Sequence, residues 1–276
     1  MADIHQFNHR AMATYFEVRI ADEERTYAAQ AAQAALDLLD KLESHLSRFR
    51  ANSDIAQIAQ LAPGGRMRLS EPAFACLEIA KRMELTTLGA FSVTAAALQA
   101  QPSLPEWHLV PEELAIQCES GRLQFDLGAI GKGFALDRMA ELLRGWDCPA
   151  FLLVAGGSSI LAGRPPKGTA GWSCGLGDDQ AVQRFFLSLT SLSGSGLAVK
   201  GSHILNPRTG KPAWRQSRAW ALANSAAESD ALSTACMVLS ESELEKVLAQ
   251  DHSWLLFLET DKVVRPIGSR ALPPQA

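Results

Sequence analysis

The sequence predicts an α+β fold, with mixed and antiparallel sheets packed against helices. Strand-like segments with alternating apolar residues occur along the whole chain, and helix-like segments lie between them. The two kinds of segment do not follow the regular strand–helix rhythm that produces a doubly wound sheet. The length of 276 residues fits either one unit or two interleaved lobes.

The N-terminal part is predicted to contain a strand, two helices and a loop. Residues 12–20 alternate and carry β-branched and aromatic side chains, which is typical of a strand. In residues 24–48, leucines recur at three- and four-residue spacing, so they share one face of an amphipathic helix. A second helix is predicted over residues 71–87, where Pro72 is tolerated in the first turn. Residues 100–113 contain three prolines and little periodicity, which indicates a loop.

The central part is predicted to join strands by glycine-rich connections. A short strand over residues 123–127 leads into a glycine-rich turn and a helix that ends near Leu143. Residues 149–157 have the apolar pattern of a buried strand and end on paired glycines. Residues 160–175 are rich in Gly and Pro and are predicted to be a loop, whereas residues 182–190 are predicted to be a strand.

The C-terminal part is predicted to contain turns, a helix and two strands. Residues 191–210 are rich in turn-forming residues. A helix is expected from Ser229 to about residue 238, with a break near Ser240. Residues 253–259 and 262–267 are predicted to be strands joined by a short Thr-Asp turn.

Composition and charge exclude several classes of protein. The net charge of −4 and the pI near 5.9 are unlike those of a nucleic-acid-binding protein, so we expect no nucleic-acid partner. No apolar run reaches the roughly 18 residues of a membrane span. The first residues show no signal-peptide pattern, which predicts a cytoplasmic protein. The five cysteines form no CxxC pair, so we expect reduced thiols rather than a zinc site or disulfides.

A glycine-rich turn is predicted between the strand at 123–127 and the helix after it. Gly128, Gly131 and Gly133 surround Lys132 in this segment, and it follows neither the GxGxxG nor the Walker A pattern. Backbone N–H groups at a helix start attract anions, glycines allow close approach, and a lysine adds charge for a phosphate. The alternative interpretation is a plain tight turn.

A second candidate segment covers residues 227–235. If it is helical, Asp230, Ser233 and Thr234 share one face. One carboxylate with neighbouring hydroxyls is an oxygen ligand set of the kind that Mg²⁺ prefers. The alternative interpretation is a helix start capped by Asp and Ser.

Two further segments carry weaker signals. His203 lies in a turn-rich stretch and has a side chain suited to acid–base chemistry, although a histidine beside apolar residues is more often structural. Arg208, in the same stretch, either binds phosphate or is solvated. The paired glycines Gly156 and Gly157 after a buried strand indicate either close approach by a ligand or a β-bulge.

Together these segments resemble the FAD:protein FMN transferase (ApbE) family, in the family's order and over residues 11–240. The resemblance is carried by MATYFEV (12–18), LSRFRANSDIAQI (46–58), DLGAIGKGFALD (126–137), LLVAGGSSILAG (152–163), SLSGSG followed by SHILNPRTGKP (191–212), and ESDALSTACMVLS (228–240). It implies a single flavin transferase-like domain over residues 1–276, built of two interleaved lobes with an ordered core over about residues 11–268.

The resemblance also implies an activity. Family members bind FAD in a cleft with a divalent cation, usually Mg²⁺, and join FMN to a Ser or Thr of a target protein while AMP leaves. Some members instead hydrolyse FAD to FMN and AMP. An FAD pyrophosphatase and a non-catalytic FAD-binding protein therefore remain alternatives.

Site residues follow from the same resemblance. The implied metal ligands are the Ala129 carbonyl, Asp230 and Thr234, with Ser233 beside them. Asp126 and Lys132 are expected to contact FAD, and His203 is the candidate general base. Residues expected to line or flank the flavin or adenine pocket are Met12, Phe49, Phe91, Ser92, Val93, Thr94 and Ile204.

Three features depart from the family pattern. Ser92 stands where members often carry Asp, Ser195 stands where Asp or Asn is frequent, and the stretch from Gly196 to Ser202 is shorter than usual. All three fall near the expected cleft, so they bear on turnover, on the choice of base and on acceptor recognition more than on binding.

Overall fold

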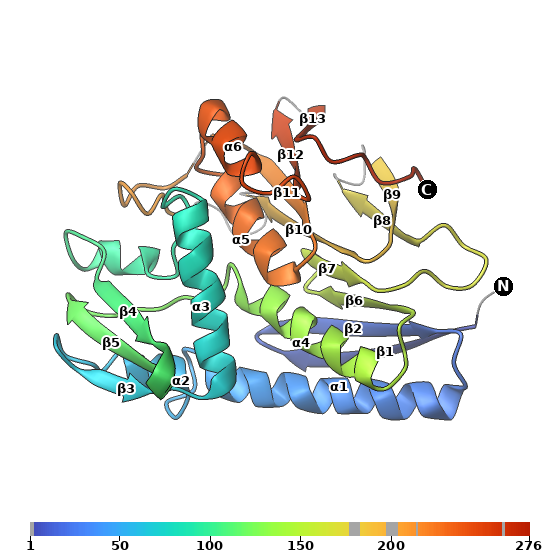
Figure 1. Ribbon diagram of the computed structural model, residues 1–276, viewed down its shortest axis with the longest axis horizontal. Coiled ribbons are helices and arrows are strands. Elements are labelled where there is room, and N and C mark those ends of the chain that lie inside the picture. Colours follow the sequence, from blue (N-terminus) through green and yellow to red (C-terminus); the bar gives the residue numbers. More distant parts are fainter. Residues whose placement is uncertain (1–2, 177–182, 197–203, 214, 261–262) are drawn as a thin grey trace.

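The main sheet of the protein has eight antiparallel strands. The computed structural model describes residues 3–176, 183–196, 204–213, 215–260 and 263–276. The strand order is β1-β2-β6-β7-β10-β11-β12-β13 (Figure 1). The bounds are β1 (Ile4–Ala11), β2 (Thr14–Ala21), β6 (Phe151–Ala155), β7 (Ser159–Ala162), β10 (Thr190–Gly196), β11 (Arg218–Ala223), β12 (Leu255–Thr260) and β13 (Val263–Ile267). Its antiparallel pairing confirms the predicted α+β class.

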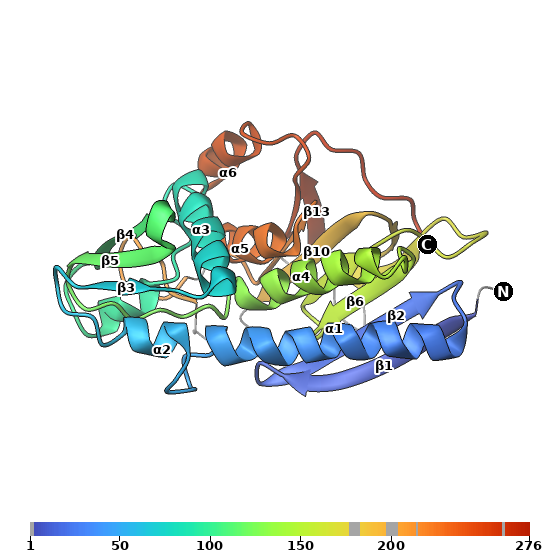
Figure 2. The ribbon, with the colours of Figure 1, turned by 60° about the horizontal axis from the view of Figure 1, so that its bottom comes forward.

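Three helices cover one face of this sheet. They are α1 (Arg25–Leu46), α4 (Gly131–Gly145) and α5 (Ala226–Cys236), and α4 lies between the other two (Figure 2). The buried face of α1 is rich in alanine, and these small side chains allow close packing. The remaining helices are α2 (Asp54–Ile58), α3 (Glu71–Thr86) and α6 (Glu241–Leu248).

A smaller sheet lies beside α3. It consists of β3 (Arg66–Arg68), β5 (Ala115–Ser120) and β4 (Glu106–Val110), with the 3₁₀ helices η1 (Ala95–Gln99) and η2 (Pro111–Glu113) next to it in the chain. A third sheet, β8 (Trp172–Leu176) with β9 (Gln183–Leu187), belongs to a second hydrophobic cluster together with side chains of the main sheet. The C-terminal segment reaches β9, because the backbone N–H of Phe186 donates to the carbonyl of Pro274 at 2.7 Å.

Most of the strongly periodic segments agree with the prediction. The structure confirms the strands predicted at 12–20, 149–157, 182–190, 253–259 and 262–267 and the helices predicted at 24–48, 71–87, after Gly131 and near Ser229, apart from shifts at their ends. Each of these segments has its own periodic apolar pattern, so its local sequence was sufficient to predict its secondary structure.

Four segments differ from the prediction. Residues 100–113 contain β4, residues 160–175 include most of β7 and the start of β8, and residues 191–210 include most of β10. Glycine, proline and serine suggested loops there, but pairing with distant strands overrides local preference. Residues 123–127 were predicted as a strand and form none in the described chain, although Asp126 N–H donates to the Val93 carbonyl at 2.7 Å. The prediction also missed β1, α2, β3, β5, β11 and α6.

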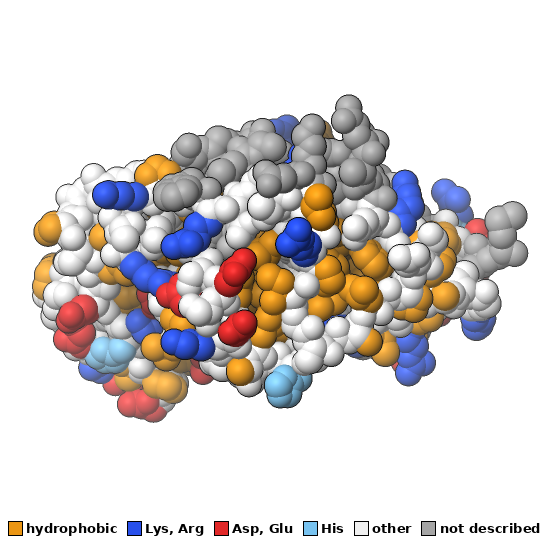
Figure 3. Space-filling model, turned by 90° about the horizontal axis from the view of Figure 1, so that it is seen from above, with side chains coloured by type: hydrophobic (Ala, Val, Ile, Leu, Met, Phe, Trp, Pro, Cys, Tyr) orange, Lys and Arg blue, Asp and Glu red, His pale blue; other side chains and the backbone are white. Residues whose placement is uncertain are grey.

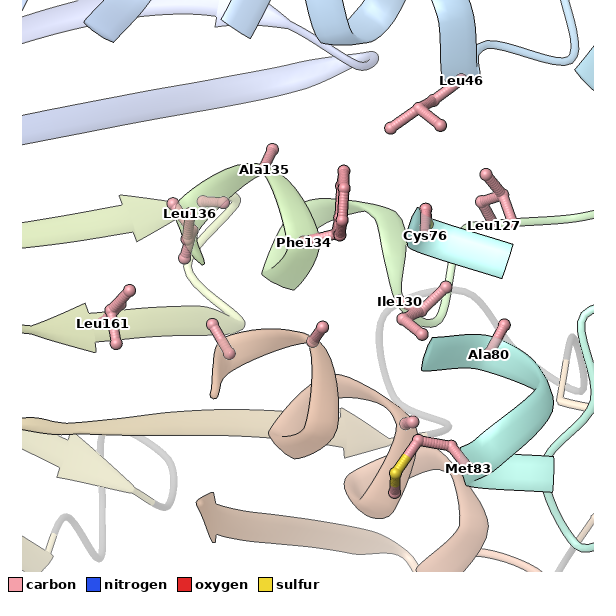
Figure 4. Close-up of a cluster of buried hydrophobic side chains, with 14 of the residues drawn as sticks. Leu46, Cys76, Ala80, Met83, Leu127, Ile130, Phe134, Ala135, Leu136 and Leu161 are labelled. Carbon is pink, nitrogen blue, oxygen red and sulfur yellow. The ribbon is translucent and has the colours of Figure 1, made fainter. Parts of the chain in front are cut away.

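The glycine-rich turn before α4 is anchored in the main hydrophobic core. Leu127 and Ile130 flank the turn, and both side chains are buried close to Cys76 and Ala80 of α3 (Figure 4). Phe134, one turn into α4, lies in the same cluster (Figure 4). Buried apolar neighbours on both sides therefore hold Gly128 and Ala129 in place.

The face over which α6, β12 and β13 lie carries a band of hydrophobic side chains across its middle (Figure 3). Apolar atoms contribute much of any protein surface, so this band alone assigns no function. None of the helices in the described part of the chain is long and apolar enough to cross a membrane.

Candidate functional site

The site is built where α4 crosses α5. Gly133, in the first turn of α4, faces the N-terminus of α5, and a Cβ atom at this position would overlap the carbonyl oxygen of Ala226. Only glycine allows the two backbones to approach this closely. The approach puts the first turn of α4 beside Asp230 of α5.

Asp137 fixes the same crossing one turn further along α4. Its carboxylate accepts hydrogen bonds from the backbone N–H groups of Ala226 at 2.8 Å and Ala227 at 2.9 Å, and from the Ser225 hydroxyl at 2.7 Å. Burial raises the pKa of Asp137, and these three hydrogen bonds oppose that effect. Asp137 thus satisfies N–H groups that the start of α5 leaves without helical partners.

Asp230 is the acidic group at the centre of the site. It is 4% exposed, and each carboxylate oxygen has a neutral donor. The Gly133 N–H donates to Oδ2 at 2.8 Å, and the Ser159 hydroxyl donates to Oδ1 at 2.6 Å. The ammonium of Lys132 lies 3.8 Å from Oδ2.

Hydroxyl groups join α5 to β10 beside this carboxylate. The Ser193 and Ser229 hydroxyl oxygens are 2.9 Å apart. The hydroxyl of Ser195 lies 3.0 Å from that of Ser233 and 3.2 Å from that of Thr234. The Ser233 and Thr234 hydroxyls also donate to the backbone carbonyl of the aspartate at 3.0 and 3.1 Å. The hydroxyls on the predicted metal-binding face are therefore ordered by one another.

Asp126 organises the glycine-rich turn. Its Oδ1 accepts the Gly128 N–H at 2.9 Å, and its Oδ2 accepts from Arg48 at 2.8 Å. The Lys132 ammonium lies 3.5 Å from the Gly128 carbonyl, so it contacts both this turn and the α5 carboxylate. Arg48 also stacks over the ring of Phe49, with its guanidinium carbon 4.8 Å from the ring centroid.

The predicted pocket-lining residues differ in exposure. Phe49 is 80% exposed and has the Arg48 guanidinium over its ring, whereas Phe91, Val93 and Thr94 are buried. Ser92 is half-buried, and its hydroxyl lies 3.0 Å from that of Thr94.

The remaining predicted residues are Met12, Ile204, His203 and Arg208. Met12 is half-buried and has φ of 49°, and Ala13 has φ of 58°, so both adopt the left-handed conformation in the turn between β1 and β2. Ile204 is buried in the main core. His203, the candidate base, lies outside the described residues. Arg208 pairs with Glu243 of α6 rather than facing solvent alone.

The donor set suits a hard divalent cation. Each carboxylate oxygen of Asp230 keeps a lone pair beyond its one short hydrogen bond, and the Ser233 and Thr234 hydroxyls lie on the same helix face. These are oxygen ligands of the kind that Mg²⁺ prefers, with one carboxylate. Within the described ranges, no three His, Cys, Asp or Glu side chains gather as a metal-binding group.

Sequence reasoning overlooked several residues of the site. Four residues that the sequence did not indicate have direct contacts with the predicted residues or with α5. They are Ser159, Ser193, Arg48 and Asp137. The serines at 191, 193 and 195 alternate as strand residues do, and this alternation was the available signal. It was outweighed by the turn preference of Ser and Gly.

Comparison with known proteins places the chain in a family. Residues 12–257 match the model of the ApbE family. The FAD:protein FMN transferase of Escherichia coli (strain K12) is 24% identical over 143 residues, which cover 47% of this chain and only 40% of that protein's length. The FAD:protein FMN transferase of Vibrio cholerae serotype O1 is 22% identical over 271 residues, with coverage of 85% and 81%.

Solved structures agree in fold. The flavin transferase ApbE from Vibrio cholerae superposes with a TM-score of 0.81 at 18% identity, and 98% of each chain is covered. The apo form of the flavinyl transferase ApbE from Pseudomonas stutzeri gives 0.82 at 21% identity, covering 97% of this chain and 94% of the other. At such identities the likeness concerns the fold alone. Since the family model matches most of the sequence, this chain belongs to the ApbE family.

Proposed function

We propose that this protein is a Mg²⁺-dependent FAD:protein FMN transferase. The observation that carries the proposal is that Asp230 lies next to Lys132 and is hydrogen-bonded to the first turn of α4. A carboxylate, hydroxyls, an ammonium group and helix amides in one region suit a pyrophosphate with a divalent cation. Its relatives in the family are named FAD:protein FMN transferase.

In this proposal, Asp230, Thr234 and Ser233 hold Mg²⁺ together with the Ala129 carbonyl. When bound, the cation supplies Lewis-acid polarisation of the pyrophosphate and neutralises charge on the AMP leaving group. The buried hydrogen bonds from the Gly133 N–H and the Ser159 hydroxyl fix the orientation of the Asp230 carboxylate. Ordered ligands of this kind lower the cost of assembling the site.

The other residues bind and orient the substrates. The Lys132 ammonium holds the pyrophosphate oxygens at the start of α4, because phosphoryl transfer depends mainly on positioning and charge. Phe49 offers an exposed ring for stacking, and Asp126 fixes the turn that carries Gly128. His203 takes the proton as the acceptor hydroxyl attacks the FMN phosphorus and the bond to AMP breaks.

The partners are FAD and a target protein that carries a Ser or Thr flavinylation motif. Residues 1–276 would act as one flavin transferase domain, with an ordered core over about residues 11–268. We place the protein in the cytoplasm, where its five cysteines would stay reduced.

The test is AMP release from FAD, with and without Mg²⁺, in the presence of an acceptor domain bearing a Thr motif. The intact mass of the acceptor is then measured. We expect Mg²⁺-dependent AMP and an acceptor heavier by one FMN, and loss of both with Asp230→Asn. AMP with free FMN and an unmodified acceptor would instead indicate an FAD pyrophosphatase. FAD binding without AMP would indicate a binding protein, for which Ser92 and Ser195 are the first residues to change to Asp.

A further inference from the structure

Lys132 provides the positive charge next to Asp230. Two neutral donors contact the Asp230 carboxylate at short distance, and the Lys132 ammonium lies 3.8 Å away. Among the described residues, no other cation lies within ion-pair distance of this carboxylate. The carboxylate is 4% exposed, so screening by solvent is weak and the ammonium is its main counter-ion.

The ammonium is nevertheless held loosely. Its two contacts, 3.8 Å to Asp230 and 3.5 Å to the Gly128 carbonyl, are both long for charge-assisted hydrogen bonds. Lys132 is the second residue of α4, where the helix dipole disfavours a positive charge. Its side chain is 22% exposed and flexible, so it can move toward an incoming anion.

A divalent cation at Asp230 competes with this ammonium. The site offers one carboxylate, and the ammonium beside it already neutralises that charge and repels a second cation. A pyrophosphate at the start of α4 would attract the ammonium away from the carboxylate and attract the metal at the same time.

We propose that Lys132 is the counter-ion of Asp230 in the ligand-free protein and yields this place to the divalent cation when the pyrophosphate of FAD binds. Metal and FAD then bind cooperatively, each raising the affinity for the other by the same factor. The inference rests on the metal site of the proposed function, and it adds a reason for the metal to enter together with its substrate.

The test measures Mn²⁺ binding to the ligand-free protein by the electron paramagnetic resonance signal of free Mn²⁺. Four proteins are compared: wild type, Lys132→Met, Lys41→Met and Asp230→Asn. Lys41 is exposed on α1, so its variant has the same change in net charge away from the site. We expect Lys132→Met to bind Mn²⁺ about 10-fold more tightly than wild type, within the usual range of coupling between sites. Lys41→Met should match wild type, and Asp230→Asn should lose the binding.

A second measurement uses the fact that the coupling between metal binding and FAD binding is reciprocal. The factor by which Mg²⁺ tightens FAD binding, read from flavin fluorescence on rapid mixing, should be about 10-fold smaller in Lys132→Met than in wild type. The inference is wrong if Lys132→Met binds Mn²⁺ no more tightly than Lys41→Met does. It is also wrong if neither of these two variants binds Mn²⁺. If Asp230→Asn still binds Mn²⁺ like wild type, the metal site itself is wrong. The AMP assay then judges the proposed activity separately.

Discussion

At the scale of single residues, both short hydrogen bonds to the Asp230 carboxylate come from neutral groups. The hydroxyl of Ser159 and the N–H of Gly133 occupy one position on each oxygen, and both groups come from segments far away in the sequence. A buried polar group without a partner is costly, so each neighbour matters to stability as well as to orientation. The sequence could identify Asp230 from its spacing to Ser233 and Thr234. It could not identify Ser159, because that contact exists only after β7 and α5 pack together.

Removal of the Ser159 hydroxyl tests this dependence. Ser159→Ala should lower the free energy of unfolding by about 1–3 kcal/mol, since a buried carboxylate oxygen loses its 2.6 Å donor. Urea unfolding at pH 7 measures the change. The matched control is Ser158→Ala at the neighbouring half-buried position, which should change stability by at most about 0.5 kcal/mol. Equal losses in the two variants would remove Ser159 from the site.

At the scale of elements, the crossing of α4 and α5 explains the spacing of the glycine-rich motif. Gly133 permits the contact, and Asp137, four residues later on the same helix face, caps α5. The resemblance to the family included residues 126–137 as one motif but implied no role for Asp137. In the segment after residue 190, by contrast, local sequence preference predicted the wrong structure. Its serines and glycines predicted turns, whereas β10 forms because β7 and β11 pair with it on both sides.

The helix cap leads to a prediction for Asp137→Asn. An amide has one acceptor oxygen, so its NH₂ group would face a backbone donor of Ala226 or Ala227. We expect a loss of about 1–3 kcal/mol in the free energy of unfolding, measured with urea. The control is Asp37→Asn on α1, an exposed carboxylate that accepts a hydrogen bond from the Gln33 side chain, and it should lose less than about 0.5 kcal/mol. Similar stability of the two variants would mean that the cap contributes little.

The start of α6 predicts a pH dependence. Glu243 accepts the Ser240 N–H at 2.9 Å and pairs with Arg208, and the Ser240 backbone hydrogen bond is the main cause that lowers the pKa of Glu243 to about 2. A lowered native pKa stabilises the fold above pH 4.5, and this stability is lost as the pH falls from 4.5 toward about 2. Glu243→Gln should therefore be less stable than wild type by about 1 kcal/mol at pH 6, a gap that narrows at acid pH. The control is Glu241→Gln, an exposed carboxyl in the same turn. A gap that stays constant with pH would contradict the assignment.

At the scale of the whole molecule, the site draws on segments that are far apart in the sequence. The loop after α1 supplies Arg48 and Phe49, the start of α4 supplies Lys132, and α5 supplies Asp230. The α+β class and the helices could be predicted because their apolar periodicity is local. The order of the strands could not, because it is set by long-range packing. A ligand that contacts all these segments should therefore stabilise the whole chain.

Thermal unfolding of the whole chain tests that expectation together with the role of Lys132. A ligand that binds only the native state stabilises it by about 2.7 kcal/mol at 100 times its Kd, which raises the midpoint of unfolding. FAD alone should raise the midpoint moderately and Mg²⁺ alone very little, because the Lys132 ammonium already neutralises Asp230. FAD and Mg²⁺ together should raise the midpoint by more than the sum of the separate shifts, since each ligand raises the affinity for the other. In Asp230→Asn, Mg²⁺ should add nothing to the shift caused by FAD. Additive shifts in the wild-type protein would show that metal and FAD bind independently, and the ammonium of Lys132 would then be only a phosphate ligand.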